Sequence, residues 1–158
     1  MMKIEGVSGS SGHKGFEATF EIDAFPFSAY RPGVTAGNKD RNGIGKMEMP
    51  PLHISGPFGP DVWAIANAMG KGAVLTKATV SAIETMDQKL KTILEAVYTN
   101  VRVVALDGGL HGEPTNGRFN AVLEYDEVKI KHTGQDTTGK DLPAATFGFN
   151  RQTAVVVG

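Results

Sequence analysis

Cysteine is absent from the 158 residues of this chain. Its absence excludes disulfide bonds, zinc sites made of thiolates and a cysteine nucleophile. A chain without cysteine fits any compartment. It also suits a protein that passes from a reducing compartment to an oxidising one, because its covalent structure does not change on the way.

Long apolar runs and an excess of either charge are absent too. No stretch approaches about 18 continuous apolar residues, so we expect no membrane insertion. No apolar run of signal-peptide length follows Met1, so we expect a cytoplasmic protein that uses, for any export, a route without a cleaved signal. The 16 basic and 17 acidic residues give a net charge of -1. No basic field is available for nucleic acid, and we expect no nucleic-acid partner.

The residues that could carry chemistry do not form a recognisable catalytic set. No two of the four histidines stand at a metal-ligand spacing. Two acidic pairs follow strand alternation: Glu21 with Asp23, and Glu124 with Asp126. A solvated strand face gives the same pattern as a pair of hydrolase carboxylates. No nucleophile motif surrounds Ser55 or Ser81. We therefore expect no enzyme activity, no cofactor and no metal.

Strand patterns fill most of the chain. Apolar and polar residues alternate along residues 16–24, and Phe119, Ala121, Leu123 and Tyr125 share one face of a later segment. The segment over residues 89–106 is expected to break or twist near Asn100. In all we expect strands at residues 3–7, 16–24, 46–54, 74–83, 89–106, 119–131 and 144–157. Their spacing is typical of a sandwich or a barrel, in one domain over residues 1–158.

One helix is predicted over residues 60–70. Val62, Ile65, Ala66 and Met69 recur at i, i+3, i+4 and i+7 and form one apolar stripe. The segment Gly59-Pro60-Asp61 suits a helix start, and Gly70-Lys71-Gly72 suits a helix end. Trp63 lies one step off the stripe, which leaves two alternatives open for it. It is either a core anchor or an anchor in a subunit interface.

Several strands are apolar on both faces, including residues 103–106 and 154–157. A small barrel buries only the inner face of its strands, and a helix of about ten residues covers too little of the outer face. We therefore expect another subunit to cover part of these strands. A long polar, glycine-rich stretch over residues 31–45 has no helix or strand pattern, and loops of this length are often functional.

The order of these elements matches a known pattern. A first strand ends in Ile4-Glu5-Gly6-Val7, and a loop with His13-Lys14-Gly15 precedes the segment from Ile22 to Ser28. The glycine-rich loop then leads to Gly45-Lys46-Met47-Glu48-Met49, and the helix opened by Gly59-Pro60 feeds the strand after Gly72. In this order and spacing the chain resembles the Hcp family (haemolysin-coregulated protein), the tube subunits of type VI secretion systems. The resemblance runs through nearly the whole chain and is strongest over residues 4–106.

This resemblance implies a mainly β fold, in which a small barrel of two packed antiparallel-rich sheets carries one short flanking helix. It implies that six copies close into a ring and that rings stack into an exported tube. The expected partners are other copies of the chain, the spike and sheath proteins, and small effectors in the lumen. The long loop would meet the neighbouring ring through Arg31, Val34, Asn38, Lys39, Asp40 and Arg41.

Two other functions stay open at this point. A phage tail-tube protein would share the tube architecture. A monomeric β-sandwich that binds a ligand such as carbohydrate would need an exposed aromatic platform, whereas most aromatic residues here sit in core-facing alternation.

Overall fold

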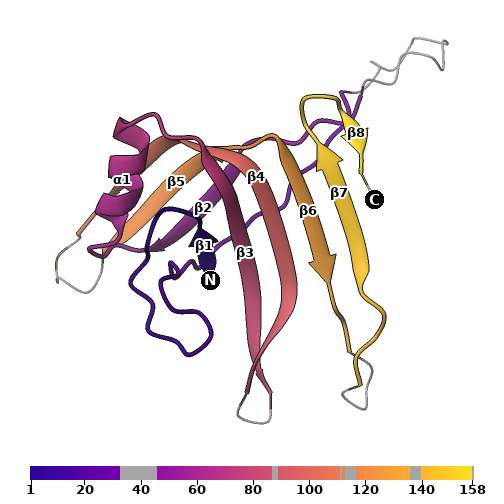
Figure 1. Cartoon of the computed structure of the whole chain (residues 1–158), viewed down its shortest axis with the longest axis horizontal. Coiled ribbons are helices and arrows are strands. Elements are labelled where there is room, and N and C mark those ends of the chain that lie inside the picture. The colour runs from indigo at the N-terminus through magenta and orange to yellow at the C-terminus, as the bar shows by residue number, and fades with distance from the viewer. Residues whose placement is uncertain (33–45, 87–88, 111, 113–116, 136–139, 158) are drawn as a thin grey trace.

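A computed structural model describes residues 1–32, 46–86, 89–110, 112, 117–135 and 140–157 (Figure 1). This part of the chain is mainly β with one short helix, as predicted. The strands are β1 (Met2–Ile4), β2 (Leu52–Pro57), β3 (Leu75–Met86), β4 (Lys89–Gly109), β5 (Arg118–Glu124), β6 (Glu127–His132), β7 (Ala145–Asn150) and β8 (Val155–Val156), and the helix is α1 (Val62–Gly70).

The long strand β4 organises the sheet. It pairs antiparallel with β3 along one edge, and with β6 and then β5 along the other. Beyond these neighbours lie β1 next to β3, β2 next to β5, and β7 followed by β8 next to β6. The described strands thus form two antiparallel parts that share β4, without hydrogen bonds that close them into a complete barrel.

A sharp corner in β4 joins the two parts. Its buried residues are even-numbered at Ala96 and Tyr98 and odd-numbered at Val101 and Val103. The switch occurs at Asn100, whose φ of 52° lies in the left-handed region. Without such a residue, strict strand alternation would turn one half of β4 away from the core. The twist that the sequence predicts near Asn100 is therefore the point where the sheet folds over.

The segment that pairs with β4, residues 119–131, also changes its buried face at this level. Phe119, Ala121, Leu123 and Tyr125 are all buried, as predicted, and burial then moves to Val128. The sequence predicts one strand over residues 119–131, but the structure divides it into β5 and β6 at Tyr125-Asp126. Because both runs change parity together, their apolar residues stay directed into one core.

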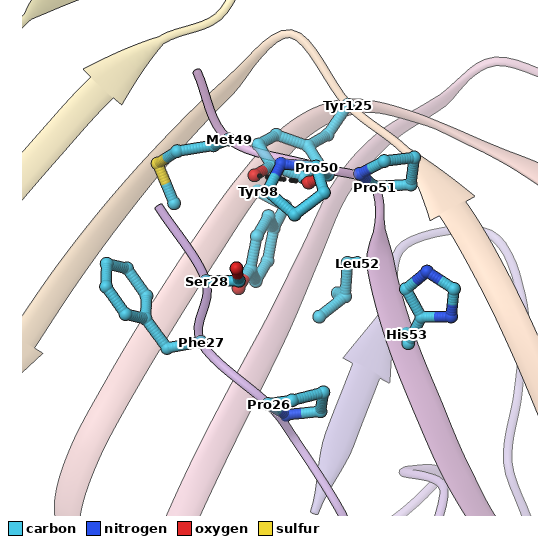
Figure 2. A pocket seen from close by; sticks show the side chains of 10 residues that line it. All are labelled: Pro26, Phe27, Ser28, Met49, Pro50, Pro51, Leu52, His53, Tyr98 and Tyr125. Carbon is cyan, nitrogen blue, oxygen red and sulfur yellow. Dashed lines mark hydrogen bonds between the residues drawn. The ribbon is translucent and has the colours of Figure 1, made fainter. Parts of the chain in front are cut away.

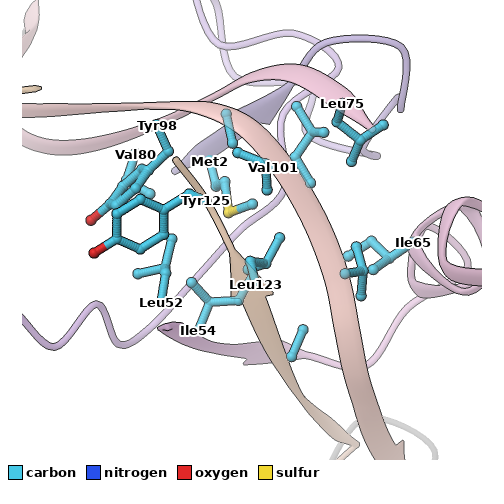
Figure 3. Packing of buried hydrophobic residues seen from close by; sticks show 14 of the residues in the cluster. Met2, Leu52, Ile54, Ile65, Leu75, Val80, Tyr98, Val101, Leu123 and Tyr125 are labelled. Carbon is cyan, nitrogen blue, oxygen red and sulfur yellow. The ribbon is translucent and has the colours of Figure 1, made fainter. Parts of the chain in front are cut away.

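The core lies inside this fold of the sheet. Figure 3 shows residues from β1, β2, β3, β4, β5 and α1 packed together there. Phe20, Phe119 and Phe149 are its largest fully buried side chains. Each buried aromatic or aliphatic side chain contributes roughly 1.5–3 kcal/mol relative to exposure, so this cluster is the main source of stability.

The predicted strand over residues 16–24 is wrong. Only Phe20 and Ala24 form isolated bridges, and Ala18 has a φ of 58°. The backbone bonds to the preceding loop instead: Gly9 N donates to the Ala18 carbonyl at 2.9 Å, and Ser11 N donates to the Thr19 carbonyl at 3.0 Å. Alternating apolar residues therefore do not make a strand here, because the loop takes their backbone partners.

Three other predicted segments are shifted. The strand expected over residues 46–54 starts only at Leu52, after Pro50-Pro51, because proline has no N–H to donate to a ladder. The last expected strand, over residues 144–157, is divided into β7 and β8 by a turn over residues 151–154. The first strand ends at Ile4, and Val7 forms only an isolated bridge.

Helix α1 begins and ends close to the predicted positions, but its buried face differs. Val62, Ile65 and Ala68 are buried, whereas Met69 is 37% exposed. Gly72 has a φ of 60° and ends the helix in the predicted left-handed conformation. The Asp61 carboxylate does not cap the helix; it accepts hydrogen bonds from Ser10 N at 3.3 Å and Ser10 Oγ at 3.0 Å. The helix start is thereby tied to the N-terminal loop.

We predict that the corner depends on the backbone of residue 100 more than on its side chain. Asn100→Ala should lower the free energy of unfolding by about 1–2 kcal/mol, because alanine resists the left-handed conformation. Asn100→Gly should cost less, because glycine adopts it without strain. Asp126→Ala removes the acceptor of the Asn100 Nδ2 hydrogen bond, 2.8 Å long, and leaves the backbone unchanged. Urea unfolding of the three variants ranks their losses in the free energy of unfolding. Equal losses for the alanine and glycine variants at position 100 would contradict the argument.

Candidate assembly surfaces

An exposed aromatic patch lies at the start of α1. Trp63 is 60% exposed, so it is no core anchor. Its ring and that of Phe58 form a T-shaped pair with centroids 5.7 Å apart. Leu110 is 56% exposed and lies beside Phe58, because both side chains crowd the position where Gly117 lacks a Cβ. We call Phe58, Trp63 and Leu110 the tryptophan patch.

A second apolar surface lies at β8. Val155 and Val156 are 52% and 58% exposed. In the described part of the chain, β8 pairs with β7 alone. Its other edge therefore has no strand partner among the described residues, and its two valine side chains are exposed on opposite faces of the strand. We call this surface the β8 edge.

The two surfaces lie at opposite ends of the molecule. Figure 1 shows α1 at one end of the long axis, and β7 and β8 toward the other. A contact between unlike surfaces at opposite ends repeats head to tail from copy to copy. Such a contact forms a closed ring when the rotation between copies completes a circle.

A polar face covers the side of the sheet that points away from the core. Because Ala78, Ala96 and Val128 are buried, the residues next to them point the other way. Lys77 pairs there with Glu5 at 3.1 Å, and Lys129 pairs with Glu127 at 3.2 Å. We call Lys77, Thr79, Glu95, Lys129 and Lys131 the polar face, and one apolar residue, Val97, lies on the same side between Thr79 and Lys129. Three of these five residues are lysines and one is a glutamate, and Glu5 and Glu127 pair with two of the lysines.

The long loop has a well-defined base. Tyr30 N donates to the Glu48 carbonyl at 3.0 Å, and Glu48 N donates to the Tyr30 carbonyl at 2.8 Å. Tyr30 Oη also donates to Glu48 Oε2 at 2.8 Å, and this bond raises the pKa of the tyrosine. Arg31 is exposed just beyond this base. The other predicted stacking residues lie outside the described residues: Val34, Asn38, Lys39, Asp40 and Arg41.

The acidic pairs of the sequence have other partners in the structure. His13 Nε2 lies 3.3 Å from Glu21, and Asp23 pairs with Arg118. Glu124 pairs with Arg151, and Asp126 accepts from Asn100. Within the described ranges, no group of three or more His, Asp or Glu side chains is placed to hold a metal ion. Nor is any helix in those ranges long and apolar enough to cross a membrane.

Sequence reasoning singled out Trp63 but missed Phe58 and Leu110. The glycines around these two residues could have indicated them. A Cβ on Gly108 would lie 3.0 Å from the Phe58 ring, and one on Gly117 would lie 2.8 Å from Phe58 Cβ. Glycines beside apolar residues indicate that backbones and rings approach closely there.

Comparisons with known proteins point to the family that the sequence resembles. The family model "Type VI secretion system effector, Hcp" matches residues 1–134. No curated protein sequence matches significantly. A solved "type six secretion system protein" is similar with a TM-score of 0.88 at 18% identity, over 99% of this chain and 97% of that chain. Hcp1 from Salmonella typhimurium is similar with a TM-score of 0.74 at 14% identity, over 99% and 96%. A type VI secretion system effector from Yersinia pestis is similar with a TM-score of 0.70 at 10% identity, over 94% and 97%.

We predict that Trp63 contributes little to the stability of one copy. Trp63→Ala should cost roughly 0.5–1 kcal/mol, mainly through the lost ring contact with Phe58. Ile65→Ala on the same helix should cost about 2–5 kcal/mol, because Ile65 is only 1% exposed. Urea unfolding at low protein concentration measures both. A loss for Trp63→Ala as large as that for Ile65→Ala would contradict the prediction.

Proposed function

Because the chain belongs to the Hcp family of type VI secretion system proteins, we propose that it is a structural subunit of the secreted tube. Six copies form a closed ring, and rings stack into the tube. Each copy is one domain over residues 1–158. The protein is made in the cytoplasm and leaves without a cleaved signal. Its partners in the apparatus are the spike and sheath proteins, and it has no catalytic role.

The family match carries this proposal, and the pair of apolar surfaces supports it. Trp63 and Leu110 of the tryptophan patch are exposed, as are the two valines of the β8 edge, and the two surfaces lie at opposite ends of the molecule. A ring hides both kinds of surface in every copy, because each copy gives one of them to each neighbour. A closed ring would also cover the exposed valines of β8.

The polar face is then the surface toward the lumen. Small effectors carried in the tube would meet lysine, glutamate and threonine side chains there. Exposed charges of mixed sign hold a partner weakly, since an exposed ion pair contributes only ~0.2–1 kcal/mol. Weak, repeated contacts suit a cargo that must be released after export.

We predict that Trp63 reports on ring formation and drives it. It is the only tryptophan of the chain, so its emission should shift to shorter wavelength when copies associate and cover it. Trp63→Ala should weaken association by about 30-fold or more, the loss expected for a hot-spot residue. Light scattering at about tens of micromolar gives the mass of each variant.

The matched control is Leu90→Ala. Leu90 is 41% exposed and apolar, but it lies in the β3–β4 hairpin, away from both surfaces. This variant should keep the mass of the parent. If Trp63→Ala keeps that mass as well, the tryptophan patch is not the interface. If both variants have a lower mass than the parent, association does not depend on the patch alone.

We predict a different effect for the loop. Replacing Lys39-Asp40-Arg41 with Gly-Ser-Gly should leave the ring intact and weaken the stacking of rings and tube-dependent secretion. Each exposed pair contributes only ~0.2–1 kcal/mol, but a ring of about six copies repeats every contact. The difference from the parent should narrow at high salt, which screens the parent's charges.

Sedimentation and a secretion assay check this prediction. Loss of the ring itself would assign the loop to contacts within the ring. Unchanged stacking and unchanged secretion would show that the three charged residues have no role.

A further inference from the structure

A mainly apolar hollow lies on the outer side of the sheet, next to the β8 edge. Val97 of β4, Thr146 of β7 and Val157, which follows β8, line it. Its volume is about 220 Å³. It lies at the border of the polar face, which contributes its charged lining residues Glu95, Lys129 and Lys131. We call it the outer hollow.

Gly148 makes room for one wall of the outer hollow. It precedes the buried Phe149, so a side chain at position 148 would point to the outer side of the sheet. A Cβ there would lie 2.9 Å from Val157 Cγ2 and still closer to the Val157 carbonyl. Val157 therefore lies across the space that a larger residue would need. Its N–H donates to the Gly148 carbonyl at 2.9 Å, which holds the wall in place.

A second hollow, shown in Figure 2, lies at Tyr98 and Tyr125. Its volume is about 50 Å³, which suits a few waters better than a large side chain. Tyr125 Oη in this hollow already donates to the Pro50 carbonyl at 3.2 Å. Of these two hollows, the outer one is therefore the one with room for a bulky side chain of another copy.

Trp63 has the shape and chemistry that the outer hollow accepts. Its ring is large and mainly apolar, and it is 60% exposed at the start of α1. In protein interfaces, tryptophan side chains typically fill pockets of the partner. Figure 1 shows α1 at one end of the long axis, with β7 and β8 toward the other. The ring and the hollow are thus placed for a head-to-tail contact between two copies.

The charges on the two sides are complementary. Lys129 and Lys131 line the outer hollow against a single glutamate, and an ammonium group is attracted to the face of an indole ring. Lys129 already pairs with Glu127 at 3.2 Å, so Lys131 contributes more of this attraction. The Asp61 carboxylate lies two residues before Trp63 and would approach the same lysines.

We propose that Trp63 of one copy inserts into the outer hollow of the next copy. This inference rests on the proposed ring and names the contact that closes it. The indole ring packs against Val97 and Val157, and the β8 edge beside them covers the rest of the tryptophan patch. The β6 part of the polar face then belongs to the contact between copies. Its β3 part, with Lys77 and Thr79, stays toward the lumen.

The first test measures association of the full chain by light scattering at several concentrations. Val97→Asp should weaken association at least about tenfold, because a carboxylate would be buried against the indole ring. Combined with Trp63→Ala, it should weaken association little beyond Trp63→Ala alone, since both changes remove the same contact. Thr79→Asp is the matched control. Thr79 is the cross-strand partner of Val97 but does not line the outer hollow, so this variant should keep the mass of the parent.

The second test locates the contact and leaves Trp63 unchanged. The chain has no cysteine, so an introduced pair supplies the only thiols. Asn67→Cys lies one helical turn after Trp63, and Thr146→Cys lies in the wall of the outer hollow. A short bismaleimide should join this pair between copies and give covalent multimers. The control pair, Asn67→Cys with Lys3→Cys on β1, should give far fewer.

Three results would overturn the contact: an unchanged mass for Val97→Asp, an equal loss for Thr79→Asp, or equal cross-linking of the two cysteine pairs. Urea unfolding at low protein concentration checks the fold of each variant. If Val97→Asp does not fold, the cross-linking result decides. Any of the three results in a parent that keeps the mass of a closed ring would refute the contact and leave the proposed ring intact. A parent that stays a single copy would overturn both.

Discussion

The fold depends on the corner where β4 turns at Asn100. Near Asn100, β4 changes the face that it buries, and the neighbouring strands β5 and β6 change theirs at the same position along the sheet. Arg151 holds the second run in place: its guanidinium pairs with Glu124, donates to the Tyr125 carbonyl at 3.0 Å and lies 4.7 Å from the centre of the Tyr125 ring. Without a common corner, half of the apolar residues of these strands would face water.

The corner also decides which surfaces stay exposed. Because the sheet folds over at β4 and does not close, it ends at β8 with an unpaired edge in the part of the chain that is described. The opposite end is covered by α1, whose nine residues bury Val62, Ile65 and Ala68 and leave Trp63 outside. The same packing that builds the core therefore leaves one apolar surface at each end, and these are the surfaces that the proposed ring would cover.

Much of this architecture could be predicted from local patterns. The limits of α1, the face shared by Phe119 to Tyr125, and the break at Asn100 each follow from a few neighbouring residues. The failures involve distant partners. Residues 16–24 alternate like a strand, but the loop at Gly9 and Ser11 takes their backbone hydrogen bonds. Likewise, the tryptophan patch combines segments that are far apart in the sequence.

The central claim is that exposed surfaces at opposite ends of one copy join head to tail into a closed ring. Negative-stain electron micrographs of the purified protein test it most directly. The account predicts uniform rings with six-fold symmetry and a central opening, together with short stacks of such rings. A field of single copies, or of two-fold symmetric pairs joined through like surfaces, would contradict it.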